Sequence, residues 1–321
     1  MRKLNLIYAI RILVIALFFV SCNDFEGEQE IPSYVKVEGF ELVENPSLNL
    51  NGPQDSSFLT SAITEVAVFV SADGKQNNMG VYTLNEDGTL QLPLLNKGKC
   101  TIELEPVVRL NGMNATRAYY VFYTTASDTV VLEEGKTTFI PKKQVSYNVQ
   151  TSIAKRIFFE STINPFVNAQ SLDSAAECRL HILNNKDSVV YGERCGSFYS
   201  SSSKDNYKVV TKDSVVGTGN KTMMLELDYC ANIPFEVGIY GQASSASQAL
   251  YISSVRMNAN FDAKYKPNDK RNWQKMYITL GKVWANINNQ PFKLWFMPVN
   301  SANNPEGFVH IDNIKLVTVK Q

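Results

Sequence analysis

The sequence predicts an all-β protein built from two consecutive β-sandwiches. Short runs of β-branched and alternating apolar residues recur after residue 30, and turn-forming residues separate them. Amphipathic helical patterns are absent from the same stretch of sequence. With 321 residues, 44% of them hydrophobic and 11% aromatic, the chain is long enough to bury a core in each of two units.

Residues 31–147 are expected to form an immunoglobulin-like β-sandwich. The strand candidates are TEVAVFV, GVYTL, CTIELEPVVRL and TVVLEEGKTTFI, with ADG, EDG and NKG as turns between them. In the third run Cys100, Ile102 and Leu104 share one face and polar residues alternate with them, as in a half-buried antiparallel strand. Evenly spaced short strands of this kind are typical of an immunoglobulin-like sandwich.

Residues 148–156, NVQTSIAKR, are polar and are expected to form a linker. The second unit, 157–321, opens with IFFE and closes with FVHIDNIKLVTV. Strand candidates between these ends include SVVYGER, MMLELDY and FKLWFMP. About ten strands over this length fit a jelly-roll sandwich better than a second immunoglobulin-like domain.

Residues 1–21 have the layout of an export signal peptide. Arg2, Lys3 and Arg11 form a positive region, and 12–20 is an apolar run too short for a stable membrane span. Since three of the 31 basic residues lie in this signal, the rest of the chain carries 28 basic and 31 acidic residues. That balance argues against a nucleic-acid partner, which would require a basic stripe to neutralise phosphates.

The segment Val20-Ser21-Cys22 resembles the lipobox of bacterial lipoproteins, in which the cysteine is lipidated and becomes the new N-terminus. The resemblance implies a lipid anchor on Cys22, and several acyl chains hold a soluble domain firmly at a membrane. The acidic tether 22–30 resembles the surface-export signal of Bacteroidetes-type lipoproteins. An outer-membrane lipoprotein exposed at the cell surface is therefore expected; the alternative is a solvated linker on a periplasm-facing lipoprotein.

In the second unit, IFFE, RNWQKMYITL and GFVHIDNIKL resemble segments of carbohydrate-binding-module and galactose-binding-like jelly rolls. The resemblance covers roughly half of the chain and implies the fold more than the ligand. It also implies a structural calcium ion between the first and last strands, with Glu160 and Asp312 as the carboxylate ligands. No other cofactor is expected. The alternation of apolar residues changes at Asp312 and Asn313, which predicts a β-bulge there.

Aromatic residues of the second unit are the candidate ligand contacts, because sugar rings stack on flat aromatic faces. Trp284, in the Asn-rich stretch KVWANINNQP, and Trp295, in FKLWFMP, are the candidates for exposed tryptophans. Tyr199 and Tyr207 are the further candidates, whereas Trp273 is expected in the core because the resembling folds bury a tryptophan there. The alternative is that all of them are packing residues or isolated surface aromatics without a ligand.

Catalysis has little support in the sequence. His181 and His310 each lie in an alternating strand, where a histidine is more often a packed or surface residue than a base. The sequence contains no G-x-S-x-G, P-loop or H-E-x-x-H motif and no convergent zinc-ligand spacing. The chain is therefore expected not to be an enzyme. A glycoside hydrolase, which needs only two suitably placed carboxylates, is the catalytic alternative.

Two covalent modifications are considered. Cys178 and Cys195 bracket the hairpin candidate CRLHILNNKDSVVYGERC, so a disulfide between them and two free thiols are both open. Four sites resemble the Asp–Ser/Thr–small-apolar signature for O-glycosylation in the same bacterial group: Thr129, Ser174, Ser188 and Ser214. The alternative at each is a turn that precedes a strand.

Together these features predict a non-catalytic surface lipoprotein that binds glycan through the jelly roll. The alternative is a structural or adhesive subunit of a surface assembly, with a protein as its partner.

Overall fold

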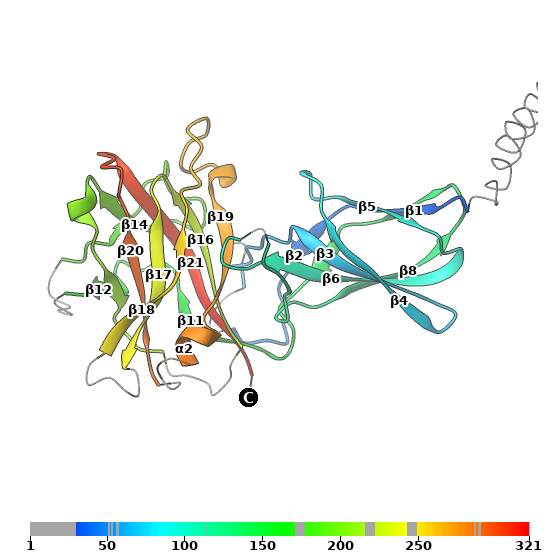
Figure 1. Cartoon of the computed structure of the whole chain (residues 1–321), viewed down its shortest axis with the longest axis horizontal. Coiled ribbons are helices and arrows are strands. Elements are labelled where there is room, and N and C mark those ends of the chain that lie inside the picture. The colour runs from blue at the N-terminus through cyan, green and yellow to red at the C-terminus, as the bar shows by residue number, and fades with distance from the viewer. Residues whose placement is uncertain are drawn as a thin grey trace, which may run out of the picture.

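The computed structural model describes residues 30–320 except 51, 53, 56–57, 114, 171–176, 216–221, 243–248, 286 and 288–289. Two β-lobes lie side by side (Figure 1). The first lobe contains β1 to β10 and the second contains β11 to β21. The predicted all-β class is confirmed. Among the described residues, no helix has the length and apolar character needed to cross a membrane.

The first lobe has three sheets. Its strands are β1 (Ser33–Val37), β2 (Phe40–Leu42), β3 (Glu65–Ala72), β4 (Lys75–Thr83), β5 (Leu90–Leu94), β6 (Gly98–Arg109), β7 (Arg117–Tyr119), β8 (Ala126–Leu132), β9 (Thr137–Ile140) and β10 (Lys143–Val145). The largest sheet has the order β4-β3-β6-β7, with β8 also paired to β6; the others are β5-β1-β9 and β10-β2. The predicted runs around β3 and β6 are strands, and the immunoglobulin-like assignment of this lobe stays a prediction.

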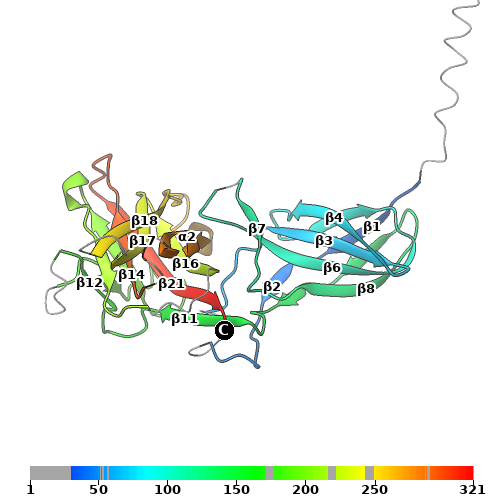
Figure 2. The same cartoon turned by 60° about the horizontal axis from the view of Figure 1, so that its bottom comes forward.

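The second lobe is a sandwich of two sheets. Its strands are β11 (Thr151–Ile157), β12 (Phe166–Asn168), β13 (His181–Leu183), β14 (Cys195–Ser200), β15 (Val209–Thr211), β16 (Met223–Ala231), β17 (Phe235–Gln242), β18 (Ala249–Met257), β19 (Gln274–Thr279), β20 (Lys293–Pro298) and β21 (Gly307–Val319). The sheet nearer the first lobe, here the junction sheet, has the order β13-β14-β21-β16-β19, with β11 paired to β21. The other, here the distal sheet, has the order β12-β15-β20-β17-β18. Figure 2 shows the second lobe and the first lobe from another side.

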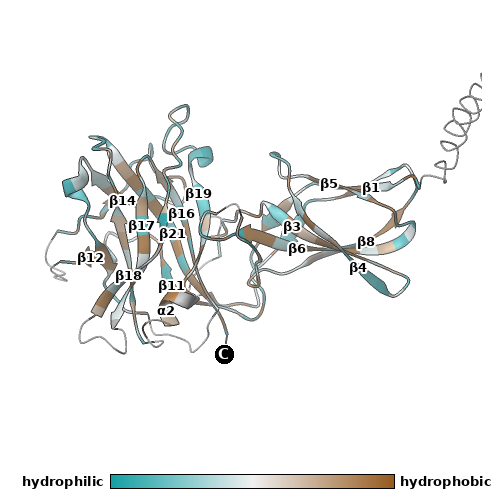
Figure 3. Cartoon of the chain, in the orientation of Figure 1, coloured by the Kyte–Doolittle hydropathy of each residue, from teal (hydrophilic) through white to brown (hydrophobic). Residues whose placement is uncertain are grey.

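Apolar side chains of the two sheets meet between them and form the core of the second lobe. Leu225 and Leu316 enter it from the junction sheet, and Ile239 and Phe296 enter it from the distal sheet. Hydrophobic colour is concentrated on the strands of both lobes (Figure 3). Successive side chains of a strand point to opposite faces, so Trp295, next to Phe296, points to the outer face of the distal sheet.

Three local predictions are wrong. Residues 151–156, expected in a linker, form most of β11, which pairs with β21; Ile153 packs in the apolar cluster of the first lobe and Ile157 in the core of the second. SVVYGER, expected as a strand, lies in the turn and bend region between β13 and β14. Trp284, expected in a loop, lies in the short helix α2 (Gly281–Ala285). In each case tertiary packing, rather than the local sequence pattern, determines the conformation of a short segment.

The predicted bulge in the last strand is confirmed. Glu226 of β16 lies opposite Lys315 of β21, but Asp228 lies opposite Asp312, so β21 has one extra residue there. Asn313 adopts φ = 52°, a left-handed conformation that asparagine tolerates better than most residues. Because of the bulge, both Asp312 and Asn313 are buried within the sheet.

Candidate functional site

The first lobe covers the outer face of the junction sheet. All nine residues of β16 are buried, so both faces of this central strand are covered. Met224, Tyr277 and Val317 point to the outer face and belong to the same apolar cluster as the core of the first lobe. The backbones also meet, because the N–H of Asn111 donates to the carbonyl of Tyr277 at 2.8 Å. This sheet face is therefore occupied by the chain itself.

A buried ionic cluster lies within the covered face. The carboxylate of Glu226 accepts hydrogen bonds from the hydroxyls of Tyr120 at 2.5 Å and Tyr147 at 2.9 Å, both from the first lobe. The ammonium groups of Lys275 and Lys315, on the strands that flank β16, lie 3.1 and 3.5 Å from the same carboxylate. Glu226 therefore links the two lobes through charge-assisted hydrogen bonds.

A second carboxylate, that of Asp228, extends the cluster. It accepts hydrogen bonds from Thr60 of the first lobe at 2.7 Å and from the Asn313 side chain at 2.9 Å. Lys315 donates to the carbonyl of Phe58 at 2.6 Å, so the segment around residue 60 is fixed at two points. Buried polar groups of this kind are stable only when they have partners, and these have partners on both lobes.

The pKa directions follow from burial and from the neighbouring charges. Burial alone would raise the pKa of Glu226, but the adjacent Lys275 and Lys315 and the two tyrosine hydroxyls hold it below its ordinary value. Burial would lower the pKa of Lys275, but Asp228 and Glu226 hold it above its ordinary value. Burial and the nearby Lys275 ammonium lower the pKa of Lys315 to about 7. Glu226 and Lys275 are thus an ionised pair at neutral pH.

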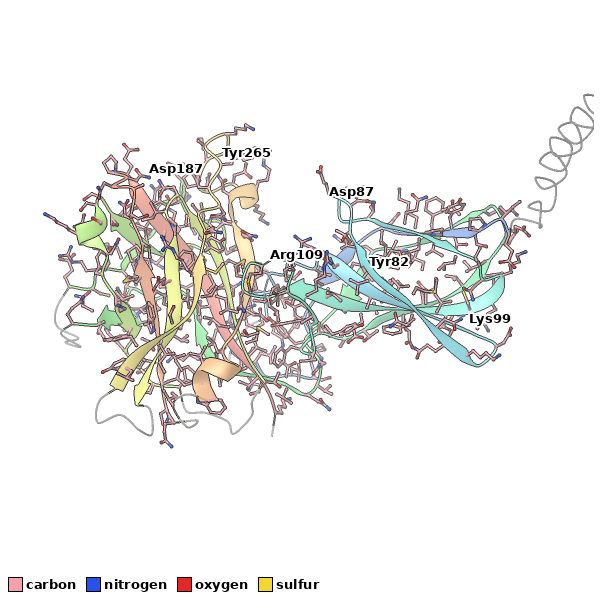
Figure 4. All side chains as sticks on the ribbon, in the orientation of Figure 1. Tyr82, Asp87, Lys99, Arg109, Asp187 and Tyr265 are labelled. Carbon is pink, nitrogen blue, oxygen red and sulfur yellow. The ribbon has the colours of Figure 1, made fainter. Side chains whose placement is uncertain are left out.

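Two loops cover a further part of the outer face of the junction sheet. Asp187 and Tyr265 mark these loops at one end of the second lobe (Figure 4). The Asn268 amide donates to the carbonyl of Lys186 at 2.9 Å and joins the loops. Beneath them lies an apolar cluster that contains Cys195, Cys230 and Trp273. The predicted burial of Trp273 is confirmed.

The outer face of the distal sheet is different, because it presents aromatic side chains. The rings of Tyr240 on β17 and Tyr251 on β18 are stacked, with centroids 4.5 Å apart and an interplanar angle of 29°. The Trp295 ring on β20 meets Tyr251 edge-on at 6.3 Å, and the Lys208 ammonium lies 5.5 Å from the Tyr251 centroid. Tyr251 is 37% exposed. We call these four residues the aromatic face.

Trp295 is the floor of the aromatic face. Its indole N–H donates to the carbonyls of Ile239 at 3.1 Å and Ile252 at 3.2 Å, on two neighbouring strands. A Cβ on Gly238 would lie 2.6 Å from the indole nitrogen, so glycine at this position lets the ring lie against the sheet. The Tyr251 hydroxyl donates to the carbonyl of Ala169 at 3.1 Å. These bonds hold the rings in fixed positions, which favours recognition of a flat ligand.

The predicted ligand contacts are placed in three different environments. Trp284 is fully buried in the core of the second lobe and Trp295 is 1% exposed, so neither is the exposed tryptophan that was expected. Trp284 packs inward because α2 places it over the core, where its N–H donates to the carbonyl of Gln290 at 3.2 Å. Tyr199 is 50% exposed, at the junction sheet. Tyr207 is half-buried beside the aromatic face, one residue before Lys208.

The two predicted calcium ligands have protein partners. The Glu160 carboxylate accepts hydrogen bonds from the backbone N–H groups of Glu193 at 3.0 Å and Arg194 at 3.4 Å. Asp312 is buried and accepts a hydrogen bond from the N–H of Asn313 at 2.7 Å; burial raises the pKa of Asp312 well above its ordinary value. Among the described residues, no group of three or more His, Cys, Asp or Glu side chains is placed to hold a metal ion. The calcium site stays a prediction.

The disulfide between Cys178 and Cys195 is not formed, and both are free thiols. Strand β13 pairs with β14 so that Leu183, not Cys178, lies opposite Cys195. Cys178 packs against the core between the sheets, whereas Cys195 belongs to the cluster under the two loops. The pairing register therefore separates the two sulfur atoms.

The modification sites remain predictions. Thr129 on β8 and Ser214 are exposed, whereas Ser188 is half-buried in a turn. Ser174 and the lipid anchor Cys22 lie outside the described residues, as do the signal peptide 1–21 and the tether up to residue 29.

Several residues of these sites were not recognised in the sequence. Tyr240 and Tyr251 occur in GIYG and LYIS, where alternation places each on one sheet face but does not say which face is open. Glu226 and Asp228 occur in MMLELDY, where alternation predicts a solvent face. The face is buried because a distant part of the chain covers it, and local pattern carries no signal for that.

No protein-family model matches the sequence, and neither does any curated protein. Solved structures with a similar arrangement include carbohydrate-binding modules of β-sandwich type. One such structure, from work on the promiscuous specificity of these modules, is 13% identical to this chain and has a TM-score of 0.31. The alignment covers 78% of this chain and 85% of that structure. The family 30 carbohydrate-binding module of a cellulosomal cellulase of Clostridium thermocellum is 10% identical, with a TM-score of 0.34, and the alignment covers 52% of this chain and 97% of that module. The K3 cleaved adhesin domain of Lys-gingipain from Porphyromonas gingivalis is also 10% identical, with a TM-score of 0.32, and the alignment covers 52% of this chain and 98% of that domain.

Proposed function

We propose that this chain is a non-catalytic glycan-binding protein and that the aromatic face of the distal sheet is its binding surface. One observation carries the proposal. The two sheets of the second lobe have two outer faces; the first lobe and two loops cover most of one, where Tyr199 stays 50% exposed, and the other presents stacked tyrosine rings with partial exposure.

The chemistry of the aromatic face fits a sugar. Pyranose rings present flat patches of C–H groups, which pack on exposed aromatic rings such as that of Tyr251, and their hydroxyls accept hydrogen bonds from groups such as the Lys208 ammonium. The rings lose little conformational entropy on binding because Tyr251 and Trp295 are already fixed by hydrogen bonds. None of these groups supplies a nucleophile with an adjacent base, so binding rather than cleavage is the function they support.

We also propose that the protein is an outer-membrane lipoprotein exposed at the cell surface. Residues 1–21 would be removed as a signal peptide, Cys22 would carry the lipid, and the acidic tether would lead to the first lobe. In this arrangement the first lobe separates the aromatic face from the membrane and fixes its orientation.

A glycan array with the purified chain tests the binding proposal. Three proteins are compared: the wild type, Tyr251→Ala and Tyr119→Ala. Tyr119 is the matched control because it is a similarly exposed tyrosine on β7 of the first lobe. Loss of the Tyr251 ring is expected to weaken binding about tenfold or more, since an aromatic contact and its buried area are worth about 1.5 kcal/mol. Tyr251→Phe keeps the ring and should retain binding.

The proposal is wrong if no glycan is retained by the wild type. It is also wrong if Tyr251→Ala and Tyr119→Ala bind every retained glycan as the wild type does.

A second candidate function is that of an adhesive subunit with a protein partner. The observation in its favour is on the first lobe, where Phe139 is 67% exposed and Val131 is 61% exposed. They lie on the neighbouring strands β9 and β8, which are joined by a hydrogen bond from Thr138 to the carbonyl of Val131 at 3.4 Å. Cross-linking in intact cells should then capture one stoichiometric partner with the wild type and lose it with Phe139→Ser.

A further inference from the structure

A polar pocket lies beside the aromatic face. It has a volume of about 260 Å³ and is lined by Asn168, Gln170, Arg179, Lys204, Asp205 and Tyr207. The backbone connects it to the aromatic face at two points, because Ala169 accepts the hydrogen bond of Tyr251 and its N–H donates to the carbonyl of Lys208 at 3.0 Å. Tyr207 packs against the core between the sheets, whereas Lys208 lies over Tyr251 and Trp295, so the pocket is on the other side of the sheet edge from the aromatic face. A glycan of several rings that lies on the aromatic face would reach the pocket by passing over Ala169.

Arg179 is held in the pocket by its neighbours. The backbone N–H of Arg179 donates to the Asn168 side chain at 2.9 Å, and its backbone carbonyl accepts a hydrogen bond from the Tyr207 hydroxyl at 3.1 Å. The guanidinium carbon lies 5.5 Å from the centroid of the Tyr207 ring, in a cation–π contact. Within the part of the chain that the structure describes, no carboxylate forms an ion pair with this guanidinium or with the Lys204 ammonium. Both cations are exposed.

Among the described residues that line the pocket, Asp205 is the one acid, and its carboxylate is already engaged in hydrogen bonds. The Asp205 carboxylate accepts hydrogen bonds from the N–H of Ser201 at 3.1 Å, from the Ser201 hydroxyl, and from the Ser202 hydroxyl at 3.4 Å. The Ser201 hydroxyl and backbone hydrogen bonds hold the pKa of Asp205 below its ordinary value. It therefore stabilises the turn from Ser200 to Asp205, and the pocket retains two cations against one engaged anion.

We propose that this pocket binds the carboxylate of an acidic sugar, such as a uronic acid, in a glycan whose other rings pack on the aromatic face. The inference rests on the proposed glycan-binding function and names the class of glycan. A planar guanidinium donates two parallel hydrogen bonds to a carboxylate, and Lys204 adds a second positive charge. Tyr207 supplies a flat surface next to the guanidinium, and the Gln170 side chain supplies an amide for a sugar hydroxyl.

Affinity electrophoresis tests the inference with two polymers of the same backbone. One gel contains polygalacturonate, and the other contains polygalacturonate whose carboxyl groups have been reduced to alcohols. The variant Arg179→Gln/Lys204→Gln is compared with Lys99→Gln/Lys264→Gln, which removes the same charge from exposed positions away from the pocket. Circular dichroism of each variant confirms the fold.

The wild type should be retarded more by the acidic polymer than by the reduced one, and added salt should weaken that retardation. The pocket variant should bind polygalacturonate about tenfold or more weakly, since charge-assisted hydrogen bonds are the strong ones, while the control variant binds as the wild type. Equal binding of both polymers, absence of binding to polygalacturonate, or equal losses in the two variants would overturn the inference. Tyr251→Ala separates this from the proposed function, because it should weaken binding of any retained polymer, acidic or neutral.

Discussion

Replacement of Glu226 by glutamine should destabilise the protein more than any surface change of the same kind. The cluster contains two carboxylates, Glu226 and Asp228, and two lysines, Lys275 and Lys315, all buried. Removal of one negative charge leaves one buried ammonium without a counter-charge and without contact to solvent. Breaking a buried pair in this way costs about 3 to 5 kcal/mol. Because burial already lowers the pKa of Lys315 to about 7, this lysine can release its proton and limit the cost.

The expected loss is therefore at the lower end, about 3 kcal/mol, a large share of the stability of a typical protein. Urea unfolding followed by tryptophan fluorescence measures it, since all three tryptophans lie in the second lobe. Glu133→Gln is the control, because Glu133 pairs with Lys136 at an exposed site. This variant should lose less than about 1 kcal/mol of unfolding free energy.

A second change separates charge from packing. Glu226→Gln/Lys315→Met restores the charge balance of the cluster and should be more stable than Glu226→Gln alone. If Glu226→Gln is as stable as Glu133→Gln, or if the double variant is less stable than the single one, the cluster does not hold the lobes together in the way described.

Two further variants probe the second lobe. Burial lowers the pKa of His310 to about 4, and its Nδ1 lies 2.9 Å from the Ser197 hydroxyl. The unfolded state therefore binds the extra proton first, so acidification from about pH 7 to about pH 5 should lower the contribution of this histidine to the unfolding free energy by about 2 kcal/mol. In urea titrations at the two pH values, the difference between wild type and His310→Gln should change by about that amount. In Gly238→Ala the new Cβ would lie 2.1 Å from the carbonyl oxygen of Ile252, so we expect a loss of about 1 to 3 kcal/mol or more and a red shift of tryptophan emission; unchanged emission would show that Trp295 does not depend on this glycine.

Strands with a strong period-two alternation could be predicted from the sequence, whereas which face of each sheet is covered could not. EVAVFVSA forms β3 and the alternating run around Ile102 forms β6, because period-two patterns and turn residues are local signals. The bulge at Asn313 was also visible, as a change of alternation.

The candidate site depended on contacts between distant segments. Glu226 alternates with leucines as a solvent-facing residue would, yet Tyr120 and Tyr147, which are 106 and 79 residues away in the chain, cover it. Trp295 was expected to be exposed because its strand has two faces; it is buried because Gly238 and two carbonyl acceptors let the ring lie flat on the sheet. Tyr251 was missed because only the position of the first lobe decides which sheet face stays open.

Hydrogen exchange with and without a bound glycan tests the central claim most directly. With a saturating amount of a glycan retained on the array, amides of β18 and of residues 207–210 should exchange more slowly, since they lie under Tyr251 and beside Lys208. Amides of β7 and β8 in the first lobe should be unchanged. Protection confined to the first lobe or to the loops over the junction sheet would contradict the assignment of the aromatic face as the binding surface.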